Sequence, residues 1–255
     1  MKIRMLGTGY GECKTKKSAS KDFRGSGGVI IDDVLLVDAP LDIFDCAEAL
    51  GFSDVLSKVT AVLVTHSHSA HFSPTAIKKL AKKKKITVYA SRVVIAMLPE
   101  SENVTGVVID DFSHVALARH DVAVLPASHA TEIPGERCFN FLITSGERTL
   151  FYALDGGGIN HRAWQVMKNL SVDAVIADAA LGDEPLTERN ISHNDVQSVA
   201  RMRDLMLSAE VAHAKTKFIL SHIPMSKKLS VHEELAPLAR QYGMTLAYDG
   251  YFVTV

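Results

Sequence analysis

Three histidines lie within one short segment of the chain, residues 64–71, which reads VTHSHSAH. Imidazole is a common ligand of first-row transition metals. In an extended backbone, residues i and i+2 project to the same side, so His66 and His68 can face one ion. His71 follows a bend and can hold a second ion. A polar loop rich in histidine is the alternative, but the spacing directly after an apolar strand favours a metal site.

Three further side chains of ligand type each follow a predicted apolar strand. They are His129, Asp155 and His222, and the strands are expected at 122–125, 149–154 and 218–220. The three glycines after Asp155 let the backbone bend close to a ligand. Each residue alone would more often be an ordinary surface group. Together with the histidine segment they indicate active groups presented on loops at strand ends.

The elements that must position these side chains alternate between short apolar strands and helices. Strands are expected at 2–6, 28–31, 34–37, 59–64, 86–90, 104–109, 114–117, 122–125, 138–143, 149–154, 172–177, 218–220, 245–248 and 252–255. Helices are expected at 41–51, 74–84, 160–170, 193–210 and 231–242, with Ser73 and Pro74 as N-cap and first helical residue. This order predicts mixed sheets covered by helices.

The composition is that of a globular protein. The chain has 255 residues, 47% hydrophobic, with 28 basic and 29 acidic side chains and a net charge of −1. Near-neutral charge argues against coating nucleic acid or an anionic membrane. No apolar stretch predicts a membrane span and no secretory signal is recognised, so a cytoplasmic location is expected. Cys13, Cys46 and Cys138 form no CxxC motif and are expected to be reduced thiols.

The order of these motifs resembles the metallo-β-lactamase superfamily, whose signature is His-x-His-x-Asp-His followed by a distant His, an Asp and a His. The matching positions are His66, His68, Ala70, His71, His129, Asp155 and His222. LGTG at 6–9 and LLVDA at 35–39 resemble it too. ISHND at 191–195 and AYDG at 247–250 look closest to the phosphodiesterase branch, which holds phosphoribosyl cyclic phosphodiesterase and ribonuclease Z.

The resemblance implies one α+β domain over residues 1–255. Its fold would be a four-layer αββα sandwich, with two mixed β-sheets flanked by helices and a dinuclear metal site at one sheet edge. Three imidazoles would hold the first ion, two imidazoles the second, and one carboxylate would bridge both. The ligands of the first ion would be His66, His68 and His129, and those of the second ion would be His71 and His222. The bridging carboxylate would be Asp155.

Three other residues receive roles by resemblance. Asp38 would accept an imidazole N–H and so orient a ligand, with a strand-end turn as the alternative. His193 would be catalytic, as a proton donor to the leaving oxygen, or would bind the substrate phosphate; capping of the following helix is the alternative. Asp178 would line the pocket or form a turn.

Ala70 departs from the family pattern, because it stands where the family has an aspartate that ligates the second ion and orients the attacking water. A methyl group can do neither, so the second site is expected to be weakened. Three explanations stay open: an engineered variant, a natural member with a weak second site, or a member that binds a phosphorylated ligand without hydrolysing it.

The predicted function is a metal-dependent hydrolase, a phosphodiesterase acting on a small cyclic or nucleotide-like ester, with zinc or manganese. A catalytically impaired ligand-binding member and a ribonuclease are the alternatives. The expected partner is the small phosphodiester, with nucleic acid less favoured, no membrane, and a homodimer as one option for assembly. The lysine run at 78–85 could meet a nucleic acid backbone, but a solvated helix end is the favoured interpretation.

Overall fold

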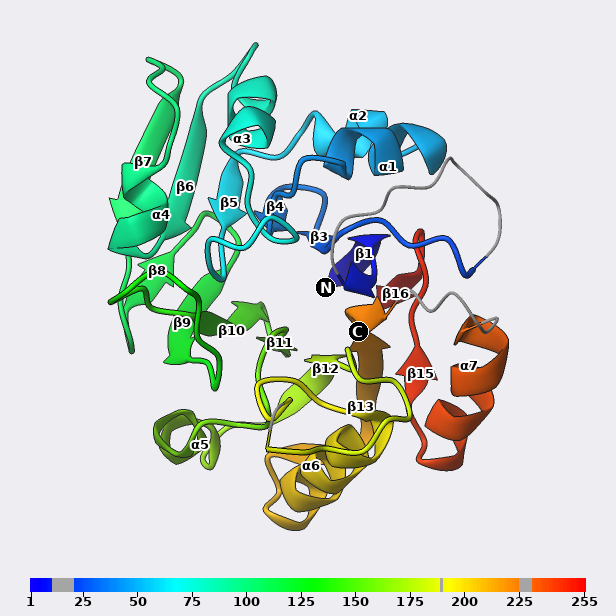
Figure 1. The fold of residues 1–255 in the computed structure, drawn as a ribbon. Helices are drawn as coiled ribbons and strands as arrows, with labels where there is room; N and C mark the ends of the chain where they lie inside the picture. Colours follow the sequence, from blue (N-terminus) through cyan, green and yellow to red (C-terminus); the bar gives the residue numbers. More distant parts are fainter. Residues whose placement is uncertain (11–20, 189, 225–230) are drawn as a thin grey trace. The chain divides into compact units, whose positions relative to one another are not determined.

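The computed structural model describes residues 1–10, 21–188, 190–224 and 231–255 (Figure 1). The chain forms two compact units. The first comprises Met1–Asp110, Thr131–Arg137 and Tyr248–Thr254, and the second comprises Asp111–Ala130, Cys138–Ala247 and Val255. Each unit holds a seven-stranded sheet with both parallel and antiparallel neighbours. The expected α+β class with two mixed sheets is confirmed.

The sheet of the first unit has the order β16-β1-β3-β4-β5-β6-β7. Its strands are β1 (Lys2–Gly7), β3 (Gly28–Ile31), β4 (Leu35–Val37), β5 (Ala61–Leu63), β6 (Ile86–Ala90), β7 (Val104–Val108) and β16 (Phe252–Thr254); the two-residue strand β2 is Gly9–Tyr10. The strands β3 and β4 form an antiparallel hairpin, whereas β4, β5, β6 and β7 run parallel. The carboxyl ends of β4 and β5 therefore lie next to each other, and the histidine segment follows β5.

Four helices pack on this first sheet through aliphatic side chains. They are α1 (Ile43–Ala49), α2 (Ser53–Leu56), α3 (Pro74–Leu80) and α4 (Arg92–Ala96). Their buried residues, such as Ile43 and Ile77, form one core cluster with Ile30, Leu36 and Val62 of the strands. The start of α3 is as predicted: the Ser73 side chain accepts a hydrogen bond from the Ala76 amide, and Pro74 opens the helix.

The sheet of the second unit has the order β15-β13-β12-β11-β10-β9-β8. Its strands are β8 (His114–Ala116), β9 (Asp121–Pro126), β10 (Phe139–Ser145), β11 (Arg148–Ala153), β12 (Val172–Asp178), β13 (Ala212–Ser221) and β15 (Thr245–Leu246), and β14 is Ile223–Pro224. The strands β11, β12, β13 and β15 run parallel, and β10 is antiparallel to both β9 and β11. The carboxyl ends of β9, β11, β12 and β13 therefore share one edge.

Three helices cover the second sheet: α5 (His161–Met167), α6 (Val196–Ser208) and α7 (Val231–Gln241). Side chains such as Met167, Val199 and Leu235 form one core cluster with Phe151 and Val175 of the strands. No helix in the described part of the chain is both long and apolar enough to span a membrane.

Several boundaries differ from the prediction for physical reasons. Helix α6 begins at Val196 rather than 193, because Asp195 is the N-cap and accepts from the Ser198 amide. Strand β13 begins at Ala212, whereas the sequence predicts a strand only at 218–220. The first half of β13 is polar, and its residues therefore do not form the apolar run that indicates a strand. The short helices α2 and α4 are not predicted, because each has too few turns for its apolar residues to show a helical period. Cys46 and Cys138 are buried, and Cys13 lies outside the described residues.

Candidate metal centre

In the first unit, Asp38 fixes the histidine segment that follows β5. The fully buried Asp38 carboxylate accepts hydrogen bonds from the Thr65 amide at 2.8 Å and from His71 Nδ1 at 2.8 Å. Because a carboxylate only accepts, Nδ1 carries the proton and the lone pair of His71 lies on Nε2. Two backbone bonds hold the same loop, from the Ala39 amide to the His71 carbonyl and from the Ser73 amide to the Ala39 carbonyl.

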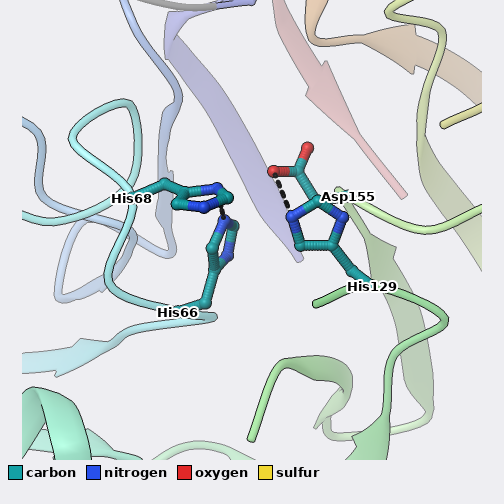
Figure 2. Close-up of side chains that lie close together, drawn as sticks. All are labelled: His66, His68, His129 and Asp155. Carbon is teal, nitrogen blue, oxygen red and sulfur yellow. Dashed lines mark hydrogen bonds and ion pairs between the residues drawn. The ribbon is translucent and has the colours of Figure 1, made fainter. Parts of the chain in front are cut away.

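The Thr65 hydroxyl extends this control to His66. It has one proton, which it donates to Asp38 at 2.9 Å, so it accepts from His66 Nδ1 at 3.0 Å. The lone pair of His66 is thereby placed on Nε2, which lies 2.9 Å from His68 Nδ1 (Figure 2). Two nitrogens that share a tetrahedral ion at about 2.0 Å lie roughly 3.3 Å apart. A small ring rotation therefore suffices for His66 and His68 to bind one ion.

Two glutamates that the sequence did not indicate hold the same loop. Glu136 accepts from the Ser67 amide at 2.8 Å, from the Ser67 hydroxyl at 2.6 Å and from the Thr131 hydroxyl at 2.6 Å. Glu132 lies 3.1 Å from His68 Nε2. No local motif could have shown these contacts, because the partners are 64 and 69 positions apart in the chain.

In the second unit, Asp155 faces two histidines with its two oxygens. Oδ1 lies 2.8 Å from His222 Nε2, and Oδ2 lies 3.8 Å from His129 Nε2 (Figure 2 shows His129 and Asp155). Asp155 and His222 are both almost fully buried and both have a left-handed backbone, with φ of 52° and 58°. The arrangement is that of a carboxylate able to bind two ions, one through each oxygen.

His193 is held beside Asp155 by Asp178. Its Nδ1 lies 2.8 Å from Asp178 Oδ2, and the other Asp178 oxygen accepts from the Ala180 amide at 2.6 Å. The His193 Nδ1 also lies 3.9 Å from Asp155 Oδ1. One ligand atom from each of Asp155, Asp178 and His193 lies within 4.8 Å of the others, close enough for one ion. The N-cap of α6 is Asp195 and not His193. Asp178 contacts both His193 and the turn at Ala180.

The glycines after Asp155 allow a close backbone approach. A Cβ on Gly157 would lie 1.7 Å from the Ile191 carbonyl oxygen, so this position cannot carry a side chain without displacing the 191–193 segment. The Asn194 side chain donates to the Gly156 carbonyl at 2.5 Å. The two loops that carry Asp155 and His193 are thus packed directly against each other.

The structure brings the predicted site residues together in two groups. In the first unit these are Asp38, His66, His68 and His71, and in the second unit His129, Asp155, Asp178, His193 and His222. Ala70 is only 7% exposed, and its methyl side chain offers no ligand atom. Imidazole nitrogens and carboxylate oxygens are a donor set that fits zinc or manganese.

A second polar cluster in the first unit is structural. Arg24 is buried and donates to the Thr8 hydroxyl at 2.7 Å, and Thr8 donates to Asp249 at 2.8 Å. Burial lowers the pKa of Arg24 to about 10 and raises the pKa of Asp249 to about 6. The start of the segment at 24–28 is therefore anchored to Thr8 and Asp249.

Comparison with known proteins agrees with this geometry. The family described as "Beta-lactamase superfamily domain" matches residues 34–223. No curated protein sequence matches the chain significantly. Among solved structures, the chain is similar to the metallo-β-lactamase fold protein YhfI from Bacillus subtilis, with 17% identity, 99% of this chain and 98% of that chain covered, and a TM-score of 0.75.

Two further structures match over the full chain. Human tRNase Z, short form, has 16% identity, covers 100% of this chain and 99% of its own, and gives a TM-score of 0.70. A diphosphatase from the PhnP family has 18% identity, covers 100% of this chain and 97% of its own, and gives a TM-score of 0.70. The expected fold is therefore confirmed. The chain belongs to the metallo-β-lactamase superfamily.

Proposed function

We propose that this chain is a metal-dependent phosphodiesterase that hydrolyses a small cyclic or nucleotide-like phosphodiester with two divalent ions, zinc or manganese. The two units would be halves of a single domain spanning residues 1–255. The proposed ligands of the first ion are His66, His68 and His129, and those of the second are His71 and His222. Asp155 would bind both. Membership of a superfamily that consists mainly of metal-dependent hydrolases supports the class of reaction.

The observation that carries the proposal is the position of Asp155 between two histidines. Its oxygens face His222 at 2.8 Å and His129 at 3.8 Å, so one carboxylate can serve two ions. The lone pairs of His66 and His71 are both set on Nε2 by the same carboxylate, Asp38. Such outer contacts are a regular feature of metal sites, because they orient the ligand and raise its basicity. The names of two matched structures, a tRNase and a diphosphatase, also point to phosphate esters.

Residues of the chain provide the acid for the leaving group. When bound, two divalent ions supply Lewis-acid polarisation of a phosphoryl oxygen and a nucleophile generated from water at neutral pH. Asp178 holds the proton of His193 on Nδ1 and stabilises the cationic imidazole. Nε2 of His193 can then donate a proton to the leaving oxygen. With 12% of its side chain exposed, His193 is in partial contact with solvent.

Ala70 supports a second candidate function, a member that binds a phosphorylated ligand and turns it over poorly. Without the family carboxylate, the second ion loses one anionic ligand and the attacking water loses a group that orients it. The remaining proposed ligands of that ion are His71, His222 and Asp155. They would hold it more weakly than a complete set.

The ribonuclease alternative receives little support from the lysine run. Lys79 lies over the Phe44 ring at 4.0 Å, and the Lys84 ammonium donates to the Leu56 and Ser57 carbonyls. Lys78 and Lys79 lie in the last turn of α3, where positive charge is favourable. These lysines are therefore explained by the fold.

A cytoplasmic location stays a prediction.

The test compares the wild-type chain, Ala70→Asp and Asp155→Asn. Elemental analysis after loading with zinc or manganese should show that Asp155→Asn loses bound metal. A generic phosphodiester should be hydrolysed by wild type and faster by Ala70→Asp, and not by Asp155→Asn. Asp173→Asn is the matched control, because Asp173 is a buried carboxylate of the second unit that accepts from the Thr149 amide and from Arg148.

The outcomes separate the candidates. Hydrolysis by Ala70→Asp alone would favour the catalytically impaired member. If neither the wild type nor Ala70→Asp hydrolyses the ester with either metal, the phosphodiesterase proposal is wrong. Binding of RNA that weakens steeply with salt would favour the ribonuclease.

A further inference from the structure

A pocket of 460 Å³ lies in the second unit between α5, α6 and the glycines that follow Asp155. Both helices lie on the second sheet (Figure 1), and their buried side chains belong to one core cluster. Gly157 and Gly158 line the pocket at one end. Its volume falls within the range of small-molecule sites, which is about 300–1,000 Å³.

The apolar part of the pocket is built around Trp164. This residue is the single tryptophan of the chain, is half-buried, and packs on the core cluster of the second unit. Ile159 and Met202 line the same pocket. A tryptophan held in this way offers a flat aromatic surface, on which a planar ring stacks with a gain of about 1–3 kcal/mol.

The polar part of the pocket is rich in donors and contains no acidic side chain. Arg201 and His161 line it and are exposed, and Arg201 Nη2 donates to the Ser198 hydroxyl at 2.9 Å. Arg201 forms no ion pair with any carboxylate in the described part of the chain. An aliphatic ligand would cover this guanidinium without pairing it, which is unfavourable. A planar ring with acceptor atoms on its edge satisfies both Trp164 and Arg201.

The pocket is continuous with the loops that carry the candidate catalytic residues. Gly157 and Gly158 follow Asp155, and Asn194 follows His193. The Asn194 side chain also lines the pocket and donates to the Gly156 carbonyl at 2.5 Å. The pocket is thus next in the chain to Asp155 and His193. The organic group of a substrate can span the distance from its phosphoryl group to the pocket only if both open to the same side, and we take them to do so.

We infer that this pocket binds the nucleobase of the substrate, stacked on Trp164, with acceptor atoms on its edge facing Arg201. The inference rests on the proposed function, since it names the substrate class as a nucleotide phosphodiester. Guanosine is the probe of choice, because the O6 and N7 atoms of guanine form the acceptor pair that arginine binds in a bidentate manner.

The test uses guanosine and the metal-free protein, so it depends on neither metal nor hydrolysis. Guanosine should quench the fluorescence of Trp164 in a saturable manner, whereas ribose 5-phosphate, which lacks the ring, should not. Arg201→Met should weaken guanosine binding about tenfold or more. Arg203→Met is the matched control on the same helix, because Arg203 binds Asp204 at 2.6 Å and does not line the pocket. It should bind like the wild type.

Calorimetry provides a second readout that needs no tryptophan. Trp164→Leu should weaken guanosine binding about tenfold, and Trp164→Phe, which keeps a ring, should lose less. Absence of saturable guanosine binding, or equal binding by Arg201→Met and Arg203→Met, would overturn the inference. Hydrolysis of a simple ester without guanosine binding would leave the proposed function intact and refute only the nucleobase pocket. Guanosine binding without hydrolysis of any ester would leave the nucleobase pocket intact and refute the proposed function.

Discussion

Replacing Asp38 with asparagine should change which nitrogen of His71 carries the proton. The Thr65 backbone amide is a fixed donor that faces Asp38 Oδ1, so the amide oxygen of the new side chain must take this position. The NH₂ group then faces His71 Nδ1, where the carboxylate now accepts at 2.8 Å. Because both groups cannot donate, His71 must move its proton to Nε2. That nitrogen can then no longer bind an ion.

The size of the effect follows from the contacts that are lost and kept. The asparagine of Asp38→Asn would keep the bonds from the Thr65 amide and hydroxyl, and therefore the control over His66. It would exchange the charge-assisted bond to His71, worth about 1.5–3 kcal/mol of unfolding free energy, for a neutral bond worth about 1 kcal/mol. Loss of an outer contact of this kind costs about 10- to 100-fold in metal affinity, or about 1.4–2.7 kcal/mol. The second ion should be affected and the first spared.

The assay is a metal titration in competition with a chromophoric chelator, with urea unfolding of the metal-free protein alongside. The control is Asp173→Asn, which makes the same change at a buried carboxylate that contacts Arg148 and the Thr149 amide. The control should lose stability and keep its metal affinity. Two ions bound to Asp38→Asn as tightly as to wild type would show that Asp38 does not set the tautomer of His71.

Three other changes test separate parts of the structure. Ala70→Asp should bind the second ion more tightly and raise phosphodiester hydrolysis by about 100-fold or more, measured by initial rates with added metal; an unchanged rate would contradict the role given to this position. Gly157→Ala should lower the free energy of unfolding by about 3 kcal/mol, because its Cβ meets the Ile191 carbonyl, whereas Gly146→Ala, with open space around its Cβ, should cost only about 1 kcal/mol. Urea denaturation of the two variants should therefore give unequal midpoints. Burial raises the pKa of Asp249 from 3.8 to about 6, so the contribution of this carboxyl to stability is full below about pH 4 and is lost as the pH rises through 6. The loss is of the order of 3 kcal/mol, and the pH profile of unfolding should show it in wild type and not in Asp249→Asn.

Strands are easier to predict from this sequence than short helices. The strands Gly28–Ile31 and Ile86–Ala90 lie where the sequence predicts them, because buried parallel or hairpin strands read as compact apolar runs. The helices Ser53–Leu56 and Arg92–Ala96 are absent from the prediction, since one turn shows no period. The polar first half of Ala212–Ser221 is absent for a related reason: tertiary pairing, not side-chain pattern, extends this strand.

The site is predictable where chemistry and chain position coincide. A histidine or aspartate that closely follows an apolar strand is visible in the sequence, as at His129 and His222. The residues that hold these groups are not visible in this way. Glu136 binds the Ser67 loop from 69 positions away, and Thr65 acts through a hydroxyl whose proton direction depends on Asp38. Only the folded structure defines such contacts.

Three of the seven residues other than glycine with positive φ in the described part of the chain lie at these strand ends. Asp38, Asp155 and His222 have φ of 62°, 52° and 58°, and each follows or nearly follows the last residue of a strand. A left-handed conformation costs a residue that is not glycine about 1–2 kcal/mol, and it persists only where neighbouring contacts enforce it. At Asp38 these contacts are the backbone bonds from its own amide to Leu63 and from the Ala39 amide to His71. The left-handed backbone conformation breaks the alternation of side-chain directions that each strand would otherwise continue. The sheets thereby orient the ligand groups, and the ladder bonds offset the cost.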